Sequence, residues 1–312
     1  MNTLYLECSS GISGDMTVAA LLDLGADDRV LMKALSGIKD ESFRTEISRV
    51  EKSGIDCCDF NVILDEEHDN HDHDMAYLYG SPAEHEEDHH GRGGHHHEDH
   101  HGRGDHHHED HHGRGDHHHE DHHGLEDHHH DDHHHEDDHG HGHHHRNLQD
   151  ITDIISVLDM SEGARALALK IFNILAEAEA KAHNRPVSEV HFHEVGAIDS
   201  IVDIVAAAVC FDDLKIDEVI IPRICEGTGT VRCQHGMLPV PVPAVLNIAE
   251  RYGLPLSIMD RKGEYVTPTG AAFAAAVMTS TSLPEILIPK KTGLGAGKRE
   301  HELPGILRAI LI

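Results

Sequence analysis

In the first 64 residues the hydrophobic positions follow the two-residue period of a strand in some segments and the spacing of a helix in others. Apolar residues alternate at 3–8, which predicts a strand, and then recur at helical spacing at 15–24 and at about 28–35. Alternation returns at 43–50 and 57–64, two segments joined through a Lys-Ser-Gly turn. The first part of the chain therefore predicts a strand, two helices and a β-hairpin.

Similar patterns resume after residue 146. They predict helices at 148–158, 161–183 and 197–214, a strand at 218–221, a Gly/Pro-rich turn region up to Pro243, a helix from there to Tyr252, a helix at 270–278, and strands near 285–289 and 306–312. Because strands and helices alternate through much of the chain, we expect an α/β fold with a mixed sheet and flanking helices.

The interruption between these two parts is a long segment rich in His and Asp. Residues 65–146 hold 32 of the 37 histidines, with an 11-residue repeat such as GRGDHHHEDHH that has no apolar position. Nothing in the repeat offsets the entropy of ordering it, so we expect disorder without metal. The predicted organisation is one globular domain in two parts, 1–64 and 147–312, interrupted by a metal-binding insertion at 65–146, without which the domain still folds.

Imidazole and carboxylate together suit nickel, zinc, copper or cobalt ions. An acidic segment that only solvates the chain would use Glu, Ser and Lys rather than so many imidazoles. The insertion is therefore predicted to bind metal, and such segments also serve as metal stores. Candidate ligands in two successive repeats are His106, His107, His108, His117, His118 and His119.

Charge, hydropathy and cysteine spacing exclude several classes of function. Of the formal charge of −32, the 25 acidic residues and three arginines of 65–145 contribute −22, so no basic face is expected for nucleic acid or an anionic membrane. No apolar run reaches the roughly 18 residues of a membrane span and the N-terminus has no export signal, which predicts a cytoplasmic protein. The six cysteines show no CxxC spacing typical of a zinc knuckle or redox pair.

The sharpest cluster of reactive side chains outside the insertion is VHFHEVGAIDSIVD at 190–203. In an extended segment His191 and His193 share one face, and Asp199 and Asp203 share one face of the helix that follows. Together with Glu194 they can converge at a strand-to-helix turn, as metal ligands or as a general base. The structural alternative is that His193 and Asp199 cap the helix while His191 packs.

Two glycine-containing turns are further candidate ligand sites. The first opens the helix at 15–24, where free N–H groups suit a phosphate or carboxylate, and the second, GTGT, lets the backbone approach a ligand closely. A glycine-rich run at 293–298 lacks the strand-helix context and the spacing of a dinucleotide fingerprint, so we assign it no nucleotide. The candidate residues are Ser13, Gly14 and Asp15 in the first turn, and Gly227 and Gly229 with the nearby His235 for the second.

Together these motifs resemble one family, the nickel insertion proteins that complete the nickel-pincer nucleotide cofactor of lactate racemase and related enzymes. The His-rich interruption is also similar to that family. The matching segments are GISGDM at 11–16, HFHEVGAID at 191–199, GTG at 227–229 with His235-Gly236 and PVP at 239–241, TPTGAA at 267–272, and GLGAG at 293–297.

The resemblance implies insertion of Ni(II) into pyridinium-3,5-bisthiocarboxylic acid mononucleotide, with CTP and a divalent cation, to form one carbon–nickel and two sulfur–nickel bonds. A ring proton must leave, so a base is needed. We assign this step to His191, His193 and Glu194. Nickel ligands are expected among Asp15, His191, His193, Asp199, Asp203 and His235, and nucleotide contacts at Ser13, Gly14, Gly227 and Gly229.

The long form of that family continues past the position of Ile312 with a domain associated with CTP binding, and it commonly has Asn where this chain has Gly305. We therefore expect a C-terminal partner polypeptide, and a racemase-type enzyme as recipient of the product. Two other functions stay open. The chain could be a nickel store or metallochaperone whose folded part docks a partner, or a divalent-metal hydrolase using His191, His193, Asp199 and Asp203.

Overall fold

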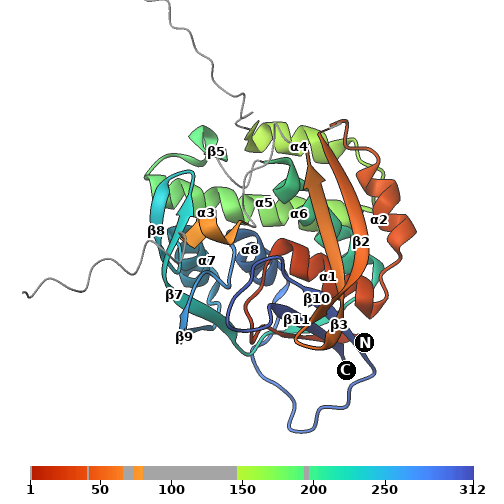
Figure 1. Ribbon diagram of the computed structural model, residues 1–312. Helices are drawn as coiled ribbons and strands as arrows, with labels where there is room; N and C mark the ends of the chain where they lie inside the picture. The colour runs from red at the N-terminus through yellow and green to blue at the C-terminus, as the bar shows by residue number, and fades with distance from the viewer. Residues whose placement is uncertain (1, 41, 66–73, 80–145, 193–196) are drawn as a thin grey trace, which may run out of the picture. The chain divides into compact units, whose positions relative to one another are not determined.

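In a computed structural model, the strands that are described form three sheets (Figure 1). The structure describes residues 2–40, 42–65, 74–79, 146–192 and 197–312. The strands are β1 (Thr3–Glu7), β2 (Phe43–Lys52), β3 (Ile55–Leu64), β4 (Arg146–Asn147), β5 (His191–Phe192), β6 (Glu218–Ile220), β7 (Ile224–Cys233), β8 (Gly236–Val240), β9 (Leu256–Lys262), β10 (Lys291–Ala296) and β11 (Ile306–Leu311). The helices are α1 (Gly14–Leu24), α2 (Asp28–Leu35), α3 (Met75–Tyr79), α4 (Leu148–Ser156), α5 (Glu162–His183), α6 (Ile198–Asp213), α7 (Pro243–Tyr252) and α8 (Pro268–Val277).

The largest sheet has six strands in the order β2-β3-β10-β11-β1-β6. Strands β3 and β10, and likewise β1 and β6, pair in parallel, whereas the other neighbours are antiparallel. Strands β2 and β3 are the predicted hairpin, which turns at Ser53 and Gly54 with positive φ angles of 52° and 80°. A three-stranded sheet, β8-β7-β9, and a two-stranded sheet, β4-β5, complete the strands described. The predicted α/β fold with a mixed sheet is confirmed.

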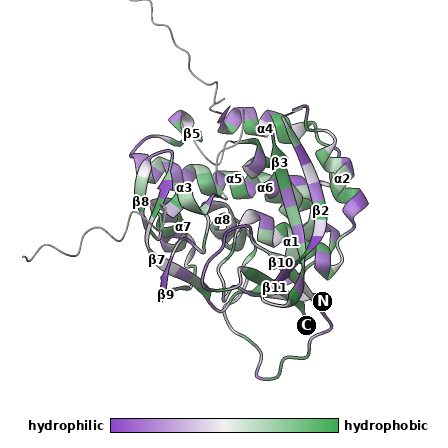
Figure 2. Cartoon of the chain, viewed as in Figure 1, coloured by the Kyte–Doolittle hydropathy of each residue, from purple (hydrophilic) through white to green (hydrophobic). Residues whose placement is uncertain are grey.

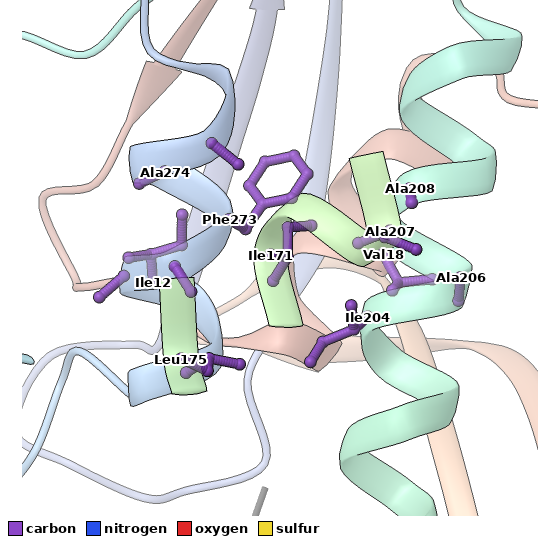
Figure 3. Close-up of a cluster of buried hydrophobic side chains, with 14 of the residues drawn as sticks. Ile12, Val18, Ile171, Leu175, Ile204, Ala206, Ala207, Ala208, Phe273 and Ala274 are labelled. Atoms are coloured by element: carbon purple, nitrogen blue, oxygen red, sulfur yellow. The ribbon is translucent and has the colours of Figure 1, made fainter. Parts of the chain in front are cut away.

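Helix α1 lies directly on the backbone of the large sheet because β10 has glycine where the two cross. A Cβ atom on Gly295 would lie 2.1 Å from the Met16 carbonyl oxygen, and one on Gly293 would lie 2.2 Å from the Ala20 carbonyl oxygen. The glycine-rich run near the C-terminus therefore includes a strand with helix-packing glycines. Helices α1, α5, α6 and α8 share one buried apolar cluster (Figure 3), which includes Ile12, Val18, Ile171, Ile204, Ala207 and Phe273.

Local sequence signals explain where the helices begin and end. The Ser161 side chain accepts a hydrogen bond from the Ala164 N–H at the start of α5, and Asn184 ends that helix in the left-handed conformation. Asn147 and Asp150 form a capping box at the start of α4. Figure 2 shows hydrophilic and hydrophobic residues interspersed along α2 and β2, as expected for elements with one face in solvent. These caps place the helices within a few residues of their predicted bounds.

Two predictions about strands were wrong. The alternation at 285–289 does not form a strand: Ile286 and Ile288 are 76% and 72% exposed, and the strand in this region is β10, a few residues later. The Gly/Pro-rich region before Pro243 is not only turn, since it contains β7 and β8, and β9 follows it. Pairing between these strands outweighs the low β propensity of a Gly/Pro-rich segment. A register shift between Glu226 and Thr228 accommodates the glycine between them.

Helix α3 is packed although it lies within the range predicted for the insertion. Leu78 is 2% exposed and joins the core, and the Tyr79 hydroxyl accepts a hydrogen bond from the Glu264 N–H at 3.0 Å. Helix α3 therefore packs on the globular domain although it was counted in the predicted insertion. The candidate metal ligands at 106–108 and 117–119 lie outside the described residues. Of the helices described, none is long and apolar enough to cross a membrane.

Candidate functional site

The N-termini of four helices meet at one cavity of about 310 Å³. A helix N-terminus presents unpaired N–H groups and a partial positive charge, so it favours a bound anion. The first turns of α7 and α8 contain no acidic residue, and Val242 gives α7 no side-chain cap. The cavity therefore has two N-termini without a nearby carboxylate of their own. The residues that these helix starts contribute are Ser13, Gly14 and Asp15 from α1, Asp199 and Ser200 from α6, Val242, Pro243 and Ala244 from α7, and Thr267, Pro268 and Thr269 from α8.

Two of these N-termini are held together by a short parallel backbone ladder. The Ile12 N–H donates to the Tyr265 carbonyl at 2.9 Å, and the Thr267 N–H donates to the Ile12 carbonyl at 3.1 Å. Gly11 has a φ of 83°, and a Cβ there would lie 1.9 Å from the Tyr265 carbonyl oxygen. A Cβ on Gly270 would lie 2.2 Å from the Ile12 carbonyl oxygen. The GISG and TPTG sequences thus bring the starts of α1 and α8 side by side.

Three carboxylates from α1 and α6 lie close together in the cavity wall. Gly14 permits this approach, because a Cβ there would lie 2.6 Å from the Asp203 Oδ2 atom. Burial raises the pKa of Asp203 well above its ordinary value, and the nearby charges of Asp15 and Asp199 raise it further, while Lys298 acts in the opposite direction. The Asp203 Oδ1 atom is buried without a hydrogen-bond partner in the described structure. A bound cation would offset this repulsion, so the group is suited to receive one.

The cavity wall also contains basic side chains. Lys298 pairs with Asp59 and Arg299 pairs with Glu264, both in partly buried surroundings. Arg232 reaches the cavity from β7 and is exposed. These three residues make the cavity mixed in charge rather than uniformly acidic.

Aromatic rings form a further part of the lining. The rings of Tyr265 and His301 stack at 4.4 Å between centroids with a tilt of 32°, and Phe192 lines the cavity from β5. Burial lowers the pKa of His301, and the neighbouring Arg299 lowers it further, so the neutral imidazole is favoured. Tyr265 and Phe192 are nearly fully buried, so they border the cavity with small parts of their rings.

Glu226 supports the backbone of this wall, a role that was not predicted from the sequence. Its Oε1 atom accepts backbone hydrogen bonds from Gly227 at 2.7 Å, Tyr265 at 2.8 Å and Val266 at 3.3 Å. Burial raises the pKa of Glu226 to about 7. A lone acidic residue within the apolar start of β7 was the available signal, since an unpaired buried carboxylate is costly.

The structure brings together six of the candidate residues, Ser13, Gly14, Asp15, Asp199, Asp203 and His235, in the lining of one cavity. Gly227 and Gly229 are not in that lining. A Cβ on Gly227 would meet the Gly263 carbonyl oxygen at 2.2 Å, so its close approach is to the chain's own backbone.

The remaining candidates are in the HFHE segment. The backbone of His191 pairs with Asn147 between β5 and β4, and His193 and Glu194 lie outside the described residues. Phe192 before this gap and Asp199 after it both line the cavity. Within the described part of the chain, no three His, Cys, Asp or Glu side chains stand ready to hold a metal ion as they are placed.

Comparisons with known proteins give consistent similarities. A family model described as "Nickel insertion protein" matches residues 4–312. A protein of Alkaliphilus metalliredigens named pyridinium-3,5-bisthiocarboxylic acid mononucleotide nickel insertion protein is 46% identical over 311 residues, which are 100% of this chain and 60% of that protein. Proteins of the same name from Clostridium acetobutylicum and Acetivibrio thermocellus are 40% and 34% identical, again over 100% of this chain, and the match covers 64% and 60% of their lengths.

The chain thus spans about three fifths of the length of these relatives. No solved structure matches it.

Proposed function

This chain belongs to the nickel insertion protein family, and on that premise we propose that it takes part in inserting Ni(II) into pyridinium-3,5-bisthiocarboxylic acid mononucleotide. The observation that carries the proposal is the cavity, which combines three clustered carboxylates for a cation with acid-free helix N-termini for an anion. A reaction that joins a metal cation to an anionic nucleotide needs both features in one place.

The substrate's groups match the lining in kind. Its phosphate and thiocarboxylates are anionic and suit the N-termini of α7 and α8 together with Arg232. Its pyridinium ring is a flat cation and suits a cavity bordered by the aromatic side chains of Phe192 and Tyr265. The N–H groups at Ser13 and Gly14 are a further contact for an anionic group, as proposed from the sequence.

Nickel, the ion to be inserted, is assigned to Asp15, Asp199 and Asp203. The two thiocarboxylate sulfurs of the substrate are good nickel ligands, so the protein need not supply a complete set by itself. This sharing of ligands is compatible with the lack of a ready three-ligand site among the described residues. Weak, incomplete holding by the protein also favours transfer of the ion to the substrate.

Forming the carbon–nickel bond breaks a ring C–H bond, and the proton must pass to a base while nickel stays Ni(II). We assign this base to the segment of His191, His193 and Glu194 on the strength of the sequence motif. The described neighbours of that segment, Phe192 and Asp199, line the cavity and support the assignment. CTP with a divalent cation is a co-substrate in this proposal, and no described residue is assigned to it.

The test is a reconstituted insertion assay. The chain is mixed with Ni(II), the bisthiocarboxylate mononucleotide and magnesium–CTP, with and without the part of the Alkaliphilus metalliredigens relative that the match does not cover. We expect a nickel-containing nucleotide by mass spectrometry when all components are present, and none without CTP. If the complete relative makes product while no combination containing this chain does, the proposal is wrong.

Single variants then test the site. His193→Ala, Glu194→Ala and Asp203→Asn should each abolish insertion, while Asp260→Asn, an exposed acid outside the cavity lining, should not. Bulk nickel binding should stay nearly unchanged in all four, because the 32 histidines of 65–146 provide it. If the two Ala variants stay folded and insert nickel at the unmodified rate, the base lies elsewhere.

Nickel storage without catalysis is the second candidate, and the composition of residues 65–146 favours it. The two functions separate when residues 80–145, which follow the packed helix α3, are replaced by a flexible linker. An insertion protein supplied with excess nickel keeps its activity, whereas a store loses its capacity.

A further inference from the structure

A second group of metal-binding side chains lines the same cavity from the strand-rich side. It consists of Cys233 at the end of β7, His235 in the following turn, and His183 at the end of α5. The Cys233 Sγ atom lies 4.0 Å from the His235 Nδ1 atom, and the rings of His183 and His235 are 4.9 Å apart between centroids. His183 thus lies beside two residues of a distant part of the chain, although the three side chains as placed do not yet form a ready metal site.

These side chains are suitable ligands for a borderline transition metal, because imidazole and thiolate both bind nickel and zinc well. In a tetrahedral site, metal–sulfur and metal–nitrogen bonds of about 2.3 Å and 2.0 Å place the two ligand atoms about 3.5 Å apart. The observed 4.0 Å exceeds this by a small margin. His235 is exposed and Cys233 is half-buried, so small side-chain rotations can close the gap.

Glu179 adds the feature that usually accompanies a histidine ligand. It lies one turn before His183 on α5, and its Oε2 atom is 3.5 Å from the His183 Nε2 atom. A carboxylate that holds one ring nitrogen directs the other towards a metal.

We propose that Cys233, His235 and His183 form a receiving site for Ni(II) on the exposed side of the cavity, with Glu179 orienting His183. Nickel binding at this site does not depend on the proposed function. The later transfer of the ion to the carboxylates of Asp15, Asp199 and Asp203 does rest on it. The site differs from residues 65–146 in one measurable respect, since that segment contains no cysteine. The other five cysteines are buried, so a nickel–thiolate signal reports on Cys233.

The experiment uses the full chain and Ni(II) alone. Nickel is added beyond saturation of the His-rich segment, and two signals are followed: the near-ultraviolet sulfur-to-nickel absorption, and alkylation of Cys233 by iodoacetamide, read by peptide mass spectrometry. We expect one thiolate-bound nickel per chain and marked protection of Cys233. Cys233→Ser should remove the absorption, while Cys225→Ala, a buried cysteine on the same strand, should retain it.

Histidine variants keep the test specific. His235→Gln and His183→Asn should each abolish protection of Cys233, and Glu179→Gln should weaken nickel binding about 10-fold to 100-fold, as loss of an orienting carboxylate does. The proposal is overturned if Cys233 reacts at the same rate with and without nickel, or if protection survives both histidine substitutions. Protection in those variants would mean that nickel elsewhere shields the thiol.

The insertion assay separates this inference from the proposed function. If both hold, Cys233→Ser slows insertion at limiting nickel and excess nickel restores the rate. Thiolate-bound nickel without insertion under any condition would leave the receiving site standing and remove the proposed activity. Insertion without any nickel–thiolate signal would support the proposed activity and rule out the receiving site.

Discussion

At the scale of single residues, Glu226 is the clearest case of a side chain whose protonation is set by burial. Its pKa of about 7 lies above the ordinary 4.5, so the stability that it confers is complete below about 4.5 and is lost as pH rises through 7. Glu226→Gln keeps an oxygen for the three backbone donors and cannot ionise. The variant should therefore gain about 2 kcal/mol relative to the parent chain between pH 5 and pH 8, read from urea unfolding at both values.

A companion variant separates ionisation from hydrogen bonding. Glu226→Ala leaves the buried N–H groups of Gly227, Tyr265 and Val266 without their acceptor. It should be less stable than the Gln variant by about 3 kcal/mol at both pH values, because neither variant ionises and the penalty of an unsatisfied buried donor does not depend on the pH. Equal behaviour of the Gln and Ala variants would show that the carboxylate does not organise this wall.

At the scale of secondary-structure elements, the contact between α1 and β10 sets how closely the helix layer approaches the sheet. A Cβ on Gly295 would lie 2.1 Å from the Met16 carbonyl and 2.5 Å from the Ala20 nitrogen, both backbone atoms that cannot move aside. Gly295→Ala should therefore destabilise the chain by about 3 kcal/mol, the upper range for overpacking, and displace the N-terminus of α1 from the cavity.

Gly305→Ala is the matched control, since a Cβ there would meet only the Arg299 carbonyl at an ordinary 3.6 Å. It should change stability by less than about 1 kcal/mol. The urea concentrations at the unfolding midpoints of the two variants give this difference in stability. A Gly295→Ala chain as stable as the control would mean that α1 and β10 can separate without loss.

At the scale of the whole molecule, the structure changes which part of the insertion can be removed without loss of stability. Replacing 80–145 by a flexible Gly/Ser linker should leave the melting temperature nearly unchanged, because closing a loop depends only weakly on its length. Replacing 67–145 also removes Leu78 and Tyr79, which pack on the core. That version should lose about 2–5 kcal/mol. Similar melting temperatures for both would show that α3 contributes nothing.

Metal binding by the whole chain should depend on pH with a sign set by imidazole. Neutral rings are the ligands and protonate near a pKa of about 6.5, so binding of several Ni(II) per chain at pH 7.5 should fade towards pH 5. Calorimetric titration measures the number of sites at each pH. One site or none at pH 7.5 would contradict the assignment of the 32 histidines to metal binding.

The amino-acid sequence alone was sufficient for the elements whose signals are local. The hairpin of β2 and β3, the approximate ranges of α4 and α5, and the α/β class follow from alternation and helical spacing, which act within a few positions. The composition of residues 65–146 likewise predicts metal binding without any structure, because imidazole chemistry does not depend on a fold.

Tertiary structure decided what depends on contacts between distant segments. It pairs β7, β8 and β9 in a region of low strand propensity, and it packs α3 at the edge of a polar segment. It also joins Asp15 to Asp203, and His183 to Cys233, across long stretches of chain. No local sequence pattern encodes these contacts between distant residues. They form because α1, α5, α6, α7 and α8 bury their apolar faces in one core, which places the ends of these helices at one cavity.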